Sequence, residues 1–172
     1  GNQPFNGEPT LEILTQEYQM IIFKHCYPVS MLESDSANVD IDSDKKTIEN
    51  YKLQYQALKD KILQFPKTKF VVWTGAIMLE PHISVQNAEN YRQFAEWVRN
   101  IWDTEGDNIF VWDFYSLETE GGLFMKPENA EAANNHHPNK DFAKRVAPLF
   151  CQRIVDIIET DGSKTTLTGE QK

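Results

Sequence analysis

Three short apolar segments stand out along the chain, at residues 18–23, 70–73 and 109–112. Each is nearly continuous rather than alternating, which is typical of strands covered on both faces of a sheet. Between and after them, apolar residues recur at helical spacing. The pattern therefore predicts strands and helices in alternation.

Amphipathic stripes predict a helix after each strand. In the first, apolar residues three or four positions apart form one stripe, made of Ile48, Tyr51, Tyr55, Leu58 and Ile62. The second stripe covers residues 88–102 and the third residues 146–158. We expect Ser43 or Asp44 to cap the first helix, because both can accept a hydrogen bond from its first turn.

The segments around the last helix are less regular. Pro148 falls inside its pattern, so we expect this helix to start near Arg145 or to kink. The tail, residues 160–172, is polar and is expected to be frayed. Residues 28–42 and 116–138 read as unusually long loops, and long ordered loops in such domains tend to be functional.

This alternation predicts an α/β domain over residues 1–159 with a parallel sheet, followed by the polar tail. In parallel sheets, ligands bind beyond the carboxyl ends of the strands. The residues predicted there are Lys24, His25, Cys26, Tyr27, Thr74, Gly75 and Asp113.

Composition narrows the class of protein. Of 172 residues, 40% are hydrophobic and 12% aromatic, which is the composition of a folded chain. No apolar run approaches the ~20 residues of a membrane span. A formal charge of −9 argues against a nucleic-acid partner, which would need clustered Lys and Arg.

The two cysteines, Cys26 and Cys151, match no metal spacing, and two buried thiols are favoured over a disulfide. We expect no cofactor. Residues 1–5 do not resemble a signal peptide, and a start at Gly rather than Met suggests that a segment precedes it. The cellular location stays open, with a periplasmic or secreted one slightly favoured.

The segment 134–139, Asn-Asn-His-His-Pro-Asn, is the most informative for chemistry. Pro138 presets the backbone and Asn139 can cap the following helix. A histidine held in this way can serve as a general base for a hydroxyl nucleophile. The alternative is an ordinary polar loop.

The remaining histidines and charged residues have simpler structural interpretations. His25, His82, His136 and His137 lack the usual metal-binding spacings, so no metal site is predicted. Lys24 is expected to pair with Asp113, and Trp73 and Trp112 to pack in the core.

Four segments together resemble the SGNH/GDSL hydrolase family, in a bacterial branch: residues 20–28, 51–74, 108–115 and 137–139. The resemblance covers residues 9–159. It implies a three-layer α/β/α, flavodoxin-like (SGNH-hydrolase-like) fold, whose first two strands have no counterpart here. It also implies ester hydrolysis by a serine on a Gly-Asp-Ser turn.

The resemblance assigns His137 to the family's catalytic histidine. Asn134 stands where the family has an aspartate, and Asp113 is the candidate substitute. The candidate ligand-binding residues, chosen from the strand ends and from the loop before the last helix, are Lys24, His25, Cys26, Thr74 and His136.

The family's serine is missing, because Asp35-Ser36 and Asp42-Ser43 lie in a polar loop rather than after an apolar strand. Two functions follow. One is a hydrolase acting on acylated carbohydrate or lipid esters with a serine upstream of this chain. The other is a non-catalytic relative that binds a ligand or partner. Cys26 as the nucleophile is a further option, against a small structural residue.

Without the two strands, the segment 18–23 would expose an unpaired apolar edge. Residues 1–17, another chain or an upstream segment would have to cover it. We therefore predict a homodimer through this edge or a visibly incomplete sheet.

Overall fold

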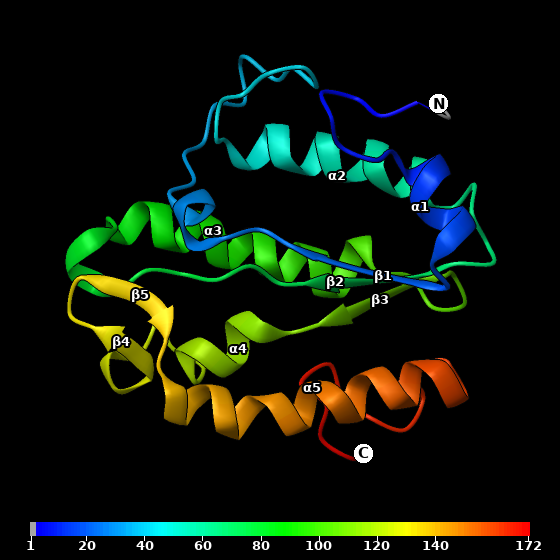
Figure 1. Ribbon diagram of the computed structural model, residues 1–172. Coiled ribbons are helices and arrows are strands. Elements are labelled where there is room, and N and C mark those ends of the chain that lie inside the picture. Colours follow the sequence, from blue (N-terminus) through cyan, green and yellow to red (C-terminus); the bar gives the residue numbers. More distant parts are fainter. Residues whose placement is uncertain (1–2) are drawn as a thin grey trace.

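The computed structural model describes residues 3–172 as a mixed α/β fold around a three-stranded parallel sheet (Figure 1). The strands are β1 (Met20–Lys24), β2 (Lys69–Trp73) and β3 (Ile109–Trp112), in the order β1-β2-β3. Lys24 pairs with Trp73, which pairs with Trp112, so the strands end in register. The parallel sheet and its three apolar strands are confirmed.

Two long helices cover one face of the sheet (Figure 1). They are α2 (Ile48–Ile62) and α3 (Val85–Trp97), which continues as a π-helical turn, Val98–Trp102. The side chain of Thr47 caps α2 by accepting a hydrogen bond from Asn50 N, so the cap predicted at Ser43 or Asp44 is wrong. Their apolar stripes form the larger core with residues such as Phe70, Val72, Ile109 and Val111.

The other face carries α4 (Phe114–Thr119) and α5 (Lys140–Thr160), as Figure 1 shows. Asn139 caps α5 as predicted, accepting a hydrogen bond from Phe142 N at 2.8 Å. The start predicted near Arg145 is wrong, because this cap begins the helix earlier and Pro148 lies inside it. Trp73 and Trp112 pack against this layer, their rings 4.5 Å apart, so the prediction of core packing is confirmed.

The remaining elements are short. They are α1 (Leu11–Glu17), 3-10 turns at Tyr27–Ser30, Glu80–His82 and Pro127–Asn129, and a hairpin of β4 (Ala130–Ala132) and β5 (Asn135–Pro138). The long loop predicted at 116–138 therefore contains most of α4 and the whole hairpin. No helix within residues 3–172 is both long and apolar enough to cross a membrane.

The C-terminal tail and α5 contact β3 and the residue that follows it. Asp113 N donates to Leu167 O at 2.8 Å, and Arg153 Nε donates to Val111 O at 3.1 Å. Gly169 fits directly against the carbonyl of Leu149 with a φ of 85°, where a side chain would clash. The tail is thus packed against the domain rather than frayed.

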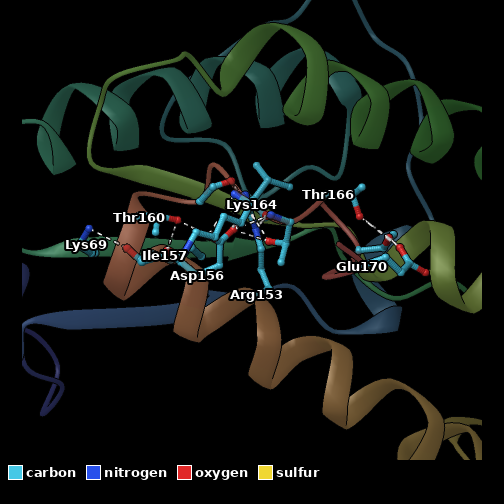
Figure 2. A network of polar contacts seen from close by, with 12 residues as sticks. Lys69, Arg153, Asp156, Ile157, Thr160, Lys164, Thr166 and Glu170 are labelled. Carbon is cyan, nitrogen blue, oxygen red and sulfur yellow. Dashed lines mark hydrogen bonds and ion pairs between the residues drawn. The ribbon is translucent and has the colours of Figure 1, made fainter. Parts of the chain in front are cut away.

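The carboxylate of Asp156 anchors this tail (Figure 2). It accepts hydrogen bonds from Lys164 N and from the N–H and hydroxyl of Thr165, the last two at 2.8 and 2.6 Å, and from the hydroxyl of Thr160. Arg153 donates to Gly162 O at 3.0 Å and lies 3.8 Å from Asp156. The sequence pattern missed this network because its members are all polar.

The opposite edge is different, since no strand of the described residues pairs with the outer side of β1. Ile22 there is 44% exposed. The segment before β1 lies beside α2, where Lys61 pairs with Glu12 at 2.5 Å (Figure 1). Gly1 and Asn2 lie outside the described residues. Association of two copies through β1 stays a prediction.

Candidate functional site at the carboxyl ends of the strands

Asp113 and Thr74 lie at the ends of neighbouring strands and bind each other. Thr74 Oγ1 donates to Asp113 Oδ1 at 2.8 Å, and the same oxygen accepts from Ser116 N. The second carboxylate oxygen accepts from Arg99 Nη1 at 2.5 Å. Both oxygens of this buried carboxylate are therefore occupied by groups that fix the start of α4.

Lys24 does not pair with Asp113, so that prediction is wrong. Its ammonium lies 5.4 Å from the centre of the Trp73 ring and its side chain is exposed. The ion pair with Asp113 is formed by Arg99 instead, which lies on the π-helical turn Val98–Trp102.

His137 lies on β5, exposed to solvent. Its Nδ1 is 2.7 Å from Asn135 Oδ1, which also accepts the backbone N–H of His137 at 3.2 Å. Because this oxygen accepts the backbone N–H, it also serves as the acceptor for Nδ1–H, which leaves Nε2 with a free lone pair. Tyr27, after β1, meets the ring edge-on at 5.1 Å. Asn134 is exposed in the hairpin turn, and Asn135 holds the imidazole instead.

His136 is the buried neighbour. Its Nδ1 accepts the backbone N–H of Leu79 at 3.3 Å, so the proton of the neutral ring is on Nε2. Burial lowers the pKa of His136, and the nearby His82 and His137 lower it further. The rings of His82 and Tyr27 lie 4.7 and 5.2 Å from its own. His136 therefore joins the loop after β2 to the hairpin.

His25 and Cys26 follow β1, and His25 packs against α2 whereas Cys26 is exposed to solvent. The ring of His25 packs between Tyr51 and Tyr55 of α2, and burial lowers its pKa. Its Nδ1 is buried without a hydrogen-bond partner among the described residues. Cys26 is exposed, as is Cys151, so the prediction of two buried thiols is wrong.

Glu118 on α4 is a buried acid near the carboxyl ends of the strands that the sequence did not reveal. Its side chain is fully buried, and Oε2 accepts the N–H of Ile77 at 2.8 Å while Oε1 has no partner in the described part of the chain. Burial raises its pKa to about 8, against the opposing effects of Ile77 N–H and the charge of Lys24. At neutral pH this carboxyl group is largely protonated.

A mostly apolar hollow of about 380 Å³ adjoins the histidines. Among its lining residues are Leu79, Pro81, Leu123, Phe124, Met125 and Ala133. Two of the lining residues also contact the histidines. The backbone N–H of Leu79 donates a hydrogen bond to His136, and the carbonyl of Ala133 lies 3.0 Å from His82 Nε2. An apolar group held there would lie beside the polar rings.

The site thus brings together the side chains of Tyr27, His82, His136 and His137. Asp113 and Thr74 are instead hydrogen-bonded to each other. Among residues 3–172, no three His, Cys, Asp or Glu side chains are grouped so that they could hold a metal ion. In comparisons with known proteins, no family model, no curated protein and no solved structure matches the chain.

Proposed function

We propose that this chain carries the histidine-bearing part of an ester hydrolase of the SGNH/GDSL kind, with a flavodoxin-like sheet and with His137 as general base. The observation that carries the proposal is the 2.7 Å contact between His137 Nδ1 and Asn135 Oδ1. It orients the exposed ring and presents Nε2 as a base. A base oriented by a third group is the arrangement that activates a nucleophile.

In the proposed reaction, Nε2 of His137 takes the proton of a serine hydroxyl whose oxygen attacks the ester carbonyl carbon. The imidazolium then gives that proton to the leaving alcohol, and water releases the acyl group by the same route. Asn135 fixes the tautomer but stabilises the imidazolium less than a carboxylate would. The serine would belong to a segment outside these 172 residues.

The hollow lined by Leu79 and Phe124 supports an ester with an apolar acyl or alkyl part, because burying such a group is favourable. The exposed polar rings beside it suit a hydroxyl-rich part, as in an acylated carbohydrate.

A second function is favoured by Asp113, whose two carboxylate oxygens are bound to Thr74, Ser116 and Arg99. A histidine without a free carboxylate partner fits a site that binds an ester or carbohydrate ligand without cleaving it.

The test compares the natural gene product that contains these residues with its His137→Ala variant, using p-nitrophenyl esters and a fluorophosphonate probe. We expect turnover and labelling of one serine, with both rates lowered at least about 100-fold by the substitution. Lys144→Ala, an exposed change on α5, is the matched control and should leave both rates unchanged.

Asn135→Asp sharpens the test, because a carboxylate would stabilise the imidazolium and should raise the rate. Absence of turnover and of labelling, with ester ligands still raising the melting temperature, would favour the binding function. Turnover that survives His137→Ala would rule out His137 as the base.

A further inference from the structure

A larger hollow, of about 1020 Å³, lies at the opposite, amino ends of the strands. Its walls come from the residues just before β2 and β3 and from those just after α5. It is separate from the histidine site, with which it shares no lining residue.

Three helices end at this hollow. The C-cap residues of α2, of the π-helical turn after α3 and of α5 all line it, and they are Leu63, Asp103 and Asp161. A helix C-terminus carries roughly half a negative charge on its free carbonyls. The hollow therefore has a negative electrostatic bias before side chains are considered.

The buried and half-buried cations nearby are already bound. Lys59 donates to Trp102 O and pairs with Asp107 at 3.2 Å. Lys69 donates to Ile157 O at 2.8 Å (Figure 2). It also pairs with Asp161. Two of the three helix ends are thus capped by lysines whose charge is balanced by a carboxylate.

The other positively charged side chains at the hollow are either paired or exposed to solvent. Arg153 is held by Val111 O and Gly162 O, with Asp156 beside it. Lys67 and Lys172 form no ion pair within the described residues, but they are exposed, where water and salt screen them.

Asp103 is the half-buried acid of this hollow that lacks such a partner, whereas Glu105, also unpaired within the described residues, is exposed. Its side chain is half-buried in the wall and makes no hydrogen bond or ion pair with any residue from 3 to 172. Burial and the carboxylate of Asp107 raise its pKa to about 6, although Arg153 and Lys59 act in the opposite direction. A cationic ligand would give this carboxylate the partner that the chain does not provide.

We infer that this hollow binds a small organic cation with a primary ammonium group, held by the carboxylate of Asp103 and by the carbonyl-rich helix ends around it. The net charge of −9 favours the approach of such a ligand over that of an anion.

The test is calorimetric titration of the protein with 1,4-diaminobutane at low salt, beside inorganic phosphate as an anionic probe. Asp103→Asn, which keeps the shape and removes the charge, should weaken diamine binding roughly 10- to 100-fold. Asp60→Asn, an exposed change on α2 outside the hollow, is the control and should not alter binding. Circular dichroism checks that both variants fold.

Unsubstituted protein provides an independent readout. Affinity should rise about tenfold between pH 5 and pH 7, as Asp103 loses its proton. Equal diamine binding by Asp103→Asn, or no pH dependence, would overturn the proposal. So would binding of phosphate without binding of diamine, which would indicate an anion site.

Discussion

Both ends of the parallel strands hold a fully hydrogen-bonded buried carboxylate, Asp156 toward the amino end and Asp113 toward the carboxyl end, but the carboxyl end also holds buried polar atoms without partners among the described residues. Toward the amino end, the buried carboxylate of Asp156 accepts hydrogen bonds from Thr160, Lys164 and Thr165, and Arg153 lies beside it. Toward the carboxyl end lie the buried side-chain atoms without partners among the described residues: His25 Nδ1, Trp73 Nε1, Trp112 Nε1 and Glu118 Oε1.

This difference bears on the free energy of unfolding. A fully hydrogen-bonded buried carboxylate stabilises the fold, whereas an unpartnered buried polar atom costs free energy. Proteins tolerate such costs where a site requires them. The carboxyl end, which also holds His137, the proposed base, is therefore the end where buried polar atoms lower the stability of the fold.

The largest effect is expected from Asp156→Ala. It removes the acceptor for the tail and leaves the buried guanidinium of Arg153 without its nearest carboxylate, so the free energy of unfolding should fall by about 4 kcal/mol. Urea denaturation measures this loss, and hydrogen exchange should show the amides of Lys164 and Thr165 becoming unprotected.

Asp141→Ala is the matched control, since this exposed carboxylate lies 3.6 Å from Lys144 on the surface of α5. It should change the unfolding free energy by no more than about 0.5 kcal/mol. If the two substitutions cost the same, the amino end is not the stabilised end.

A smaller effect on the free energy of unfolding is expected from Glu118, a buried carboxyl group at the carboxyl end. Its pKa is raised from 4.5 to about 8, so its contribution to stability is complete below pH 4.5 and is lost as pH rises through 8. Between pH 5 and pH 8 the unfolding free energy should fall by about 3.5 kcal/mol from this group alone. Glu118→Gln, which is neutral at every pH, should remove the part of the decline that Glu118 causes in urea titrations.

Glu120→Gln serves as the control, because this neighbouring carboxylate is partly exposed and pairs with Arg145 at 2.9 Å. It should leave the decline unchanged. A smaller decline should remain in Glu118→Gln, because the pKa of Asp103 is raised as well. A Glu118→Gln variant that keeps the full decline would show that Glu118 is not the titrating group.

Much of the fold was predictable from the sequence because the strands are continuous apolar segments and the helices carry clear stripes. Asn139 was identified as a cap because a Pro-Asn step precedes a strong apolar pattern. The Thr47 cap was missed because several residues in the polar run before α2 can cap a helix equally well.

The site was less predictable, because the hairpin that holds it has almost no apolar alternation. On a strand, neighbouring side chains point to opposite faces. His136 is therefore buried and His137 exposed, a difference that follows only once β5 is known to be a strand. Glu118 was missed because a glutamate in a short helix is ordinarily exposed.

The smallest expected effects distinguish these two histidines. His136→Ala should lower the unfolding free energy by about 2 kcal/mol, because it removes a buried ring and leaves the N–H of Leu79 without its acceptor. His137→Ala, on an exposed ring that is hydrogen-bonded to Asn135 and meets Tyr27 edge-on, should change it by less than about 0.5 kcal/mol. Because the folded-state pKa of His136 is lowered, its contribution is complete above pH 6.5 and is lost as pH falls, so only His136→Ala should flatten the acid side of the stability profile. Equal costs for the two substitutions would mean that His137, too, is a structural residue, and would remove the reason for treating it as the base.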